Sequence, residues 1–104
     1  MPEPLVLGRP APARALAARF PEELKPGEVA SLILWVPREA GQVDALRIEP
    51  GGRRLPLTET GRRGKRRRLV TARFETGQEA RVRIPAPPEV PVRSYRLELV
   101  RWRR

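Results

Sequence analysis

Histidine and cysteine are both absent from the 104 residues. Without histidine the chain lacks the commonest general base and the commonest metal ligand, and without cysteine it can form neither a disulfide nor a thiolate site. Every Ser-His or Cys-His nucleophile arrangement is therefore excluded, and so is a zinc site built from these ligands. The sequence predicts no catalytic residue, no metal and no cofactor.

Acidic and glycine motifs are also scarce. Asp44 is the only aspartate, and no segment places several carboxylates at alternate positions as a calcium loop requires. The run Gly61-Arg62-Arg63-Gly64 lacks the Gly-Lys-Ser/Thr ending of a phosphate-binding loop. The remaining catalytic option is a histidine-free nuclease built on Tyr95 and Arg93, similar to some small ribosome-dependent toxins. Strand alternation puts Tyr95 in the core, so we reject an enzyme.

Long apolar runs are missing as well. The longest, residues 29–36, is far shorter than the ~20 residues that span a bilayer. Residues 1–20 lack the basic start and the unbroken apolar stretch of a secretory signal. We therefore expect no transmembrane segment and a cytoplasmic protein, although a chain whose signal had been removed would look the same.

Positive charge is abundant instead. Of the 22 basic residues 20 are arginine, and asparagine is absent, a bias typical of a thermophile of high genomic GC content. Ion pairing alone would balance the two signs, yet the formal net charge is +10. Such an excess favours a polyanionic partner, for example nucleic acid or an acidic lipid surface.

From residue 28 onward apolar side chains recur at every second position, which predicts strands. The length of the chain suits one domain. Residues 28–36 are apolar on both faces, which predicts a central strand. Residues 43–49 and 53–59 predict a hairpin around Pro50-Gly51-Gly52, and Pro56 marks its second strand as an edge.

Residues 68–75 and 79–84 predict a second hairpin, turning at Thr76-Gly77-Gln78. The four prolines of residues 85–91 predict a connection that crosses to another sheet or edge. In residues 92–102 the apolar phase changes after Leu99, which indicates either a bulge or an outer face that is also covered.

The first residues are ambiguous. Residues 11–20 are rich in helix-forming alanine, leucine and arginine, while residues 5–7 fit a short strand. We expect the stretch before Pro21 to be extended, because residues 21–28 resemble the link between the first two strands of many sandwich domains. Residues 1–12 are expected to form a loose arm.

Arg19-Phe20-Pro21, then Lys25-Pro26-Gly27-Glu28 before a long strand, and the proline-rich run that precedes Tyr95 and alternating leucines together resemble an immunoglobulin-like β-sandwich. The likeness spans residues 13–102 and implies an all-β fold of about seven antiparallel strands. It implies no particular function. A small five-stranded barrel of the oligonucleotide-binding kind is the alternative fold.

The sharpest local feature is a basic loop at residues 61–68, expected to be a flexible tip between two strands. Guanidinium groups at this density can bind phosphates bidentately. The strand leading to the loop and the C-terminal end add further candidates. The predicted anion or nucleic-acid site comprises Arg53, Arg54, Arg62, Arg63, Lys65, Arg66, Arg67, Arg68, Arg101, Trp102 and Arg103.

Two functions follow from these features. The first is a non-enzymatic interaction or accessory module that binds nucleic acid or another polyanion without reading its sequence. The second is a protein-binding or assembly module, in which a sheet edge or the Val100 and Trp102 face docks onto another protein or a second copy of the chain.

Overall fold

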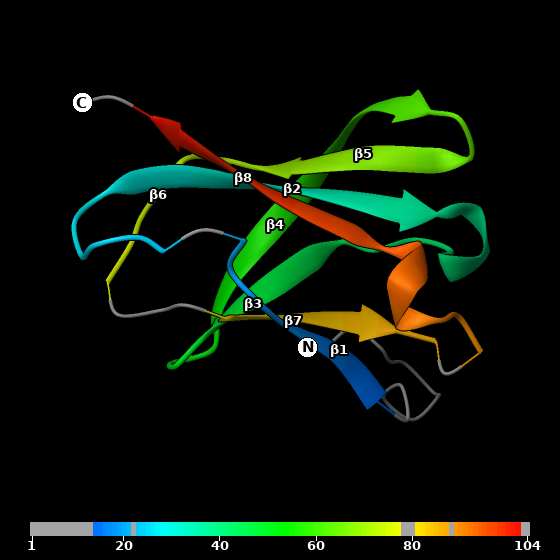
Figure 1. Cartoon of the computed structure of the whole chain (residues 1–104), viewed down its shortest axis with the longest axis horizontal. Coiled ribbons are helices and arrows are strands. Elements are labelled where there is room, and N and C mark those ends of the chain that lie inside the picture. Colours follow the sequence, from blue (N-terminus) through cyan, green and yellow to red (C-terminus); the bar gives the residue numbers. More distant parts are fainter. Residues whose placement is uncertain (1–13, 22, 78–80, 88, 103–104) are drawn as a thin grey trace.

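The computed structural model describes residues 14–21, 23–77, 81–87 and 89–102. Within them all regular structure is β-strand apart from two 3-10 turns, η1 (Arg38–Ala40) and η2 (Val92–Ser94), which confirms the all-β class (Figure 1). The strands are β1 (Arg14–Arg19), β2 (Val29–Pro37), β3 (Ala45–Glu49), β4 (Arg53–Arg63), β5 (Arg66–Thr71), β6 (Phe74–Glu75), β7 (Arg81–Ala86) and β8 (Arg96–Trp102). In this described part of the chain, no helix has the length and apolar character needed to cross a membrane.

The strands form one antiparallel sheet that curls into a half-barrel. Its order is β1-β7-β3-β4-β5-β2, with β8 and β6 also paired to β2. Strand β4 takes part in both halves of the curled sheet: its residues 53–56 pair with β3, and its residues 57–63 pair with β5 (Figure 1). One layer therefore holds β1, β7, β3 and the start of β4, and the other holds β8, β2, β5 and the end of β4.

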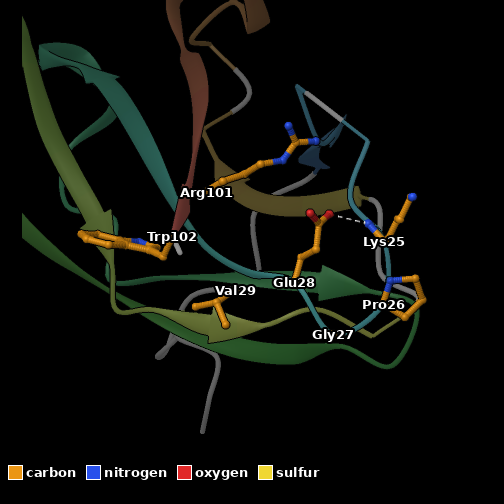
Figure 2. Close-up of a pocket in the computed structure, with 7 residues that line it drawn as sticks. All are labelled: Lys25, Pro26, Gly27, Glu28, Val29, Arg101 and Trp102. Atoms are coloured by element: carbon orange, nitrogen blue, oxygen red, sulfur yellow. Dashed lines mark hydrogen bonds between the residues drawn. The ribbon is translucent and has the colours of Figure 1, made fainter. Parts of the chain in front are cut away.

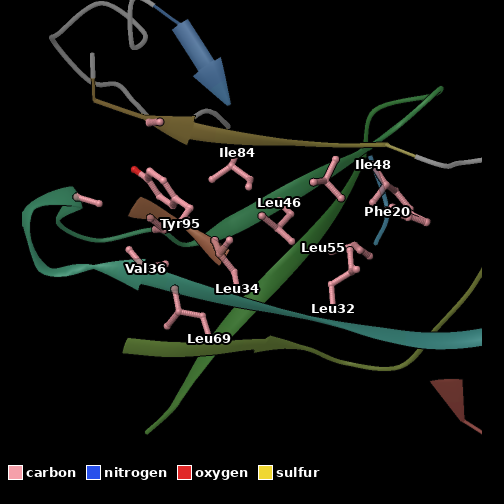
Figure 3. Close-up of a cluster of buried hydrophobic side chains, with 14 of the residues drawn as sticks. Phe20, Leu32, Leu34, Val36, Leu46, Ile48, Leu55, Leu69, Ile84 and Tyr95 are labelled. Carbon is pink, nitrogen blue, oxygen red and sulfur yellow. The ribbon is translucent and has the colours of Figure 1, made fainter. Parts of the chain in front are cut away.

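Strand β2 is central, as its two apolar faces predicted. It pairs with β8 along residues 29–35, and its other edge pairs with β5 and β6. Its inward side chains, Ala30, Leu32, Leu34 and Val36, are completely buried. Their burial places the β2 layer against the β3 and β7 layer and forms the core between them (Figure 3).

The alternation predicted for the first hairpin is confirmed. Leu46 and Ile48 of β3 are fully buried, and the chain reverses through Gly51 and Gly52, whose φ angles of 102° and 71° favour glycine. The prediction that Pro56 marks an edge strand is wrong for β4 as a whole, because β4 pairs with both β3 and β5. Pro56 itself lies in the part of β4 that pairs with β3, before the pairing with β5 begins at Leu57. Proline tolerates that position because it donates no ladder hydrogen bond.

The predicted second hairpin is wrong. Strands β5 and β6 pair with β2, whereas β7 pairs with β1 and β3 in the other layer. Thr76 explains the difference, because its backbone N–H donates to the Glu28 carbonyl at 2.8 Å and its carbonyl accepts from Gly27 N at 2.7 Å. Thr76, directly after β6, is thus fixed to the turn before β2, and the next described strand, β7, lies in the other layer. Residues 78–80 lie outside the described residues.

The stretch before Pro21 is extended, as predicted. Strand β1 pairs with β7 from Arg14 opposite Ala86 to Arg19 opposite Arg81. Pairing in the sheet overrides the helix propensity of its alanines and leucine. The predicted arm, residues 1–12, and the short strand expected within it lie outside the described residues.

The proline-rich connection crosses layers, as predicted, since β7 lies in one layer and β8 in the other. The register of β8 on β2 is continuous from Arg96 to Trp102. The change of apolar phase after Leu99 therefore reflects a partly covered outer face and not a bulge: Val100 is half-buried and Trp102 is 39% exposed.

A buried side chain replaces one link of the β2 ladder. Leu32 N lies between the stretches of β2 that pair with β5 and β6, and it donates to Thr71 Oγ1 at 3.0 Å. Thr71→Val keeps the shape and removes this acceptor, so we expect it to lower the free energy of unfolding by about 1–3 kcal/mol. Urea denaturation measures the loss.

Thr71→Ser keeps the oxygen and serves as the matched control, and Thr58→Val changes an exposed residue of the neighbouring strand. We expect the second control to stay within about 0.5 kcal/mol of the native chain. Equal losses for the valine and serine variants at residue 71 would show that the hydrogen bond does not matter.

Candidate functional site

The basic segment at residues 61–68 is a strand-paired hairpin and not the flexible loop predicted. Strand β4 continues to Arg63 and β5 begins at Arg66, so the turn consists of Gly64 and Lys65 alone. Arg62 lies opposite Arg67, and Arg63 opposite Arg66. Directly opposite residues in an antiparallel pair have Cβ atoms about 5 Å apart, and like charges there are destabilising. Backbone pairing therefore holds the arginines close together.

A bulge decides which way these arginines point. Glu59 pairs with Leu69 and Gly61 pairs with Arg68, so Thr60 is an extra residue without a partner across the ladder. Before the bulge the odd-numbered residues of β4 face the core. After it Arg63 shares a face with Arg66 and Arg68, while Arg62 shares the opposite face with Arg67. Sequence alternation missed this change, although an isolated glycine in a strand, here Gly61, is a signal for a bulge.

The second layer has a side that faces away from the core, which we call the outer face. Trp35 lies on it, directly opposite Arg68 of β5 and Arg96 of β8. The outer face includes Val29, Ser31, Ile33 and Trp35 on β2, Arg96, Glu98, Val100 and Trp102 on β8, Arg66, Arg68 and Val70 on β5, and Arg63 on β4.

Trp35 joins the hairpin to this face. The guanidinium carbons of Arg63 and Arg68 lie 5.7 and 6.0 Å from the centre of its ring, within the range of cation–π attraction. Thr60 also holds Arg68: its Oγ1 accepts from Arg68 Nη1 at 2.8 Å and donates to the Arg68 carbonyl at 3.3 Å. The bulge thus brings Arg63 onto the tryptophan beside Arg68, which the pairing of β5 with β2 already places there.

Three arginines of the hairpin, at positions 66–68, are half-buried and held by the protein's own oxygen atoms. Arg66 Nε donates to the Ser94 carbonyl at 3.2 Å, and Arg67 Nη2 donates to the Gly41 carbonyl. The one ion pair that the described residues give the hairpin is weak, with Arg67 Nη1 3.9 Å from Glu59 Oε1. Carbonyl groups orient a guanidinium without neutralising it, so the positive charge of the hairpin persists.

Arg62, Arg63 and Lys65 are the exposed charges of the hairpin, and of these Arg63 lies over the Trp35 ring. Among the described residues the side chains of Arg62 and Lys65 make no hydrogen bond or ion pair with another group. Lys65 occupies the turn itself, beside Gly64 with φ at 62°. These two side chains are available to a ligand without breaking any interaction inside the described part of the protein.

Arg53 and Arg54 do not join this site. They begin β4, whereas the hairpin tip ends it, and ten residues of strand span about 33 Å (Figure 1). Arg53 packs over the Phe74 ring at 5.7 Å and donates to the Glu75 carbonyl at 2.8 Å. Arg54 lies opposite Arg47 on β3. The sequence placed these arginines on the correct strand but at the end remote from the tip.

The predicted C-terminal cluster is divided between two faces. Figure 2 shows Arg101 and Trp102 pointing to opposite sides of β8. Arg101 Nη2 donates to the Glu23 carbonyl at 2.6 Å, and the residue lines an open groove of about 630 Å³ together with Lys25, Glu28 and Trp102. Because the groove also holds the Glu28 carboxylate, its charge is mixed. Arg103 lies outside the described residues.

Trp102 has partners that the sequence did not reveal. Its Nε1 donates to Ser31 Oγ at 2.8 Å, and the Arg73 guanidinium lies 3.9 Å from its ring centre. Arg73 comes from the irregular residues between β5 and β6. Only the pairing of β8 with β2 brings these residues together, and no local pattern indicated it.

Comparison with family models, curated proteins and solved structures found no match. The residues themselves offer one prominent feature, a strand-paired basic hairpin that adjoins a sheet face carrying both tryptophans of the chain.

The bulge yields a direct test of the side on which each arginine lies. In a Trp102→Phe background Trp35 is the single source of tryptophan fluorescence. Arg63→Ala removes a guanidinium that covers its ring, so we expect acrylamide to quench Trp35 more strongly. Arg62→Ala removes the same charge from the opposite face and should leave quenching unchanged. Equal effects of the two substitutions would place the bulge elsewhere.

Proposed function

We propose that this chain is a binding module without catalytic activity that holds a polyanion, with nucleic acid as the expected class, through its basic hairpin. The supporting observation is the imbalance of charge at residues 61–68. Six cationic side chains lie there, and a single ion pair at 3.9 Å offsets them among the described residues. A phosphate backbone would supply the negative charges that neutralise these side chains.

The binding would be electrostatic and independent of sequence. Lysine and arginine that neutralise phosphates release condensed counterions, and this release dominates non-specific affinity. Arg66, Arg67 and Arg68 are already oriented by carbonyl or hydroxyl oxygens, which reduces the side-chain entropy lost on binding. Arg62 and Lys65 would then reach the ligand from the tip.

The residue types of the chain and the burial of Tyr95 support binding in preference to catalysis. The chain has no histidine or cysteine, and Tyr95, which a histidine-free nuclease would use, packs in the core at 8% exposure. A binding module also needs no cofactor, and we propose none. The cytoplasmic location and the thermophilic source stay parts of the proposal, and the second rests on the arginine-rich composition.

We propose for the fold an immunoglobulin-like sandwich with exchanged outer strands. The pairings of β2 with β5, of β5 with β4 and of β3 with β7 match central pairs of that architecture. In an immunoglobulin domain, however, the first strand joins the β2 layer and the last joins the β7 layer. Here β1 pairs with β7 and β8 pairs with β2. The five-stranded barrel stays the alternative, since the curl of β4 suits a barrel as well.

The second candidate is a protein-binding or assembly module that uses the Val100 and Trp102 face. Trp102 favours it, as an exposed aromatic ring at the end of a sheet. Yet it is the one large hydrophobic side chain that is exposed among the described residues. A protein interface usually has a broader apolar centre, so the charge of the hairpin supports the polyanion more strongly.

The exposed tip charges provide the test. We expect Arg62→Ala combined with Lys65→Ala to reduce the slope of log affinity against log salt by about 1.4 for a single strand, or about 1.8 for a duplex, because two phosphate contacts are lost. Fluorescence anisotropy of a labelled oligonucleotide between low and physiological salt measures the slope. Replacing Arg66, Arg67 or Arg68 would disturb the protein's own hydrogen bonds as well.

Arg19→Ala combined with Arg81→Ala is the matched control. These exposed residues lie opposite one another on β1 and β7, so the control removes the same total charge from the other layer. It should leave the slope unchanged. An equal reduction in the control would mean that overall charge, and not the hairpin, attracts the ligand. Absence of binding by the native chain at low salt would refute the proposal.

A further inference from the structure

Both tryptophans of the chain lie on the outer face, at opposite ends. Trp35 lies on β2, and Trp102 lies on β8 opposite Val29. Val29 and Trp35 are six positions apart along β2, which corresponds to about 20 Å of strand. The basic hairpin adjoins the Trp35 end. The Trp102 end therefore extends the same surface away from the hairpin.

Trp102 is exposed but fixed in orientation. Its hydrogen bond goes to Ser31, which is 3% exposed, so the indole edge is anchored to a buried hydroxyl. The guanidinium carbon of Arg73 lies over the ring, 3.9 Å from its centre. Because the ring has already lost its freedom of rotation, a planar ligand that stacks here orders little further.

The Trp35 end offers a similar combination in a more covered form. Arg63 and Arg68 lie over the ring, and Arg96 lies beside it on β8. Guanidinium planes and aromatic rings are the two kinds of surface on which proteins stack unpaired bases. The outer face thus has such a surface at each end.

The middle of the outer face is apolar and low in negative charge. Ile33, Val70 and Val100 lie between the two tryptophans. Glu98 is the acidic side chain of this middle part, and its Oε2 lies 3.2 Å from Arg96 Nε. Glu75 at the edge of β6 is the other carboxylate nearby. Five arginines oppose these two glutamates: Arg63, Arg66, Arg68, Arg73 and Arg96.

We propose that the outer face binds single-stranded nucleic acid, with bases stacked at Trp102 and Arg73 and at the Trp35 end, and with phosphates held by the surrounding arginines. This inference rests on the proposed function and names its ligand class. A duplex would present phosphates to the hairpin equally well. Its bases are paired and stacked inside, however, and could not reach the tryptophans.

The test compares labelled oligothymidylate of about 12 nucleotides, within the usual range for a site of this kind, with a duplex of the same length. Trp102→Leu removes the stacking ring at an exposed position. We expect it to weaken oligothymidylate binding about 5- to 150-fold, the equivalent of ~1–3 kcal/mol for one stacked base. It should change neither the duplex affinity nor the salt slope, since Trp102 contacts no phosphate.

Two further variants guard against a folding artefact. Trp102→Phe keeps an aromatic ring and should retain most of the affinity, while Arg73→Ala leaves every residue of β8 unchanged and should also weaken single-strand binding. Thermal unfolding monitored by circular dichroism checks that each variant folds. Oligouridylate in place of oligothymidylate distinguishes RNA from DNA as the source, and tighter binding of either strand than of duplex supports the inference.

The two proposals can fail separately. If single strand and duplex bind equally and Trp102→Leu has no effect, while Arg62→Ala with Lys65→Ala still reduces the salt slope, then the hairpin binds polyanions and the stacking inference is wrong. Competition by heparin as strong as that by oligothymidylate would also contradict the stacking inference. If no nucleic acid binds at low salt, both proposals are wrong.

Discussion

The structure depends on one strand that serves two layers. Strand β4 pairs with β3 through residues 53–56 and with β5 through residues 57–63, so the sheet must curl where the partner changes. The curl brings the inward face of β2 over β3 and β7 and encloses the core. The same continuity carries the end of β4 beyond the core, where it forms the basic hairpin.

The bulge at Thr60 then determines what the hairpin can do. A strand without it would point Arg62 toward Trp35 and Arg63 away from it. With the extra residue, Arg63 joins Arg68 over the ring, and the Thr60 hydroxyl binds Arg68. The hairpin is therefore part of the outer face and does not form a separate tip. A local irregularity of one residue thus joins the positive charge to the aromatic surface.

Several arginines of this chain donate hydrogen bonds to neutral oxygen atoms and not to carboxylates. Arg66, Arg67 and Arg101 donate to backbone carbonyls, and Arg68 donates to a threonine hydroxyl. Such contacts position a guanidinium and leave its charge in place, whereas a carboxylate would cancel the charge. A close ion pair between the Arg83 guanidinium and the Glu49 carboxylate, at 2.9 Å, lies in the other layer. On the outer face Arg66 and Arg68 are therefore held in position with their charge in place, while Arg96 is paired with the Glu98 carboxylate at 3.2 Å.

The sequence by itself determined most of the strands, because alternation of apolar side chains is a local property: the central position of β2, the hairpin of β3 and β4 and the crossing before β8 all followed from the sequence. It missed the strand ends at residues 61–63 and 66–67, which were expected to be a loop. Tertiary structure alone decided the partners. Thr76 binds the turn before β2, so β7 pairs with β1 and β3 and not with β6. Likewise Arg73, Ser31 and Trp102 meet only because β8 lies beside β2. Hydrogen bonds between strands carry no trace in the order of residues, since any exposed strand edge offers the same backbone groups to a partner.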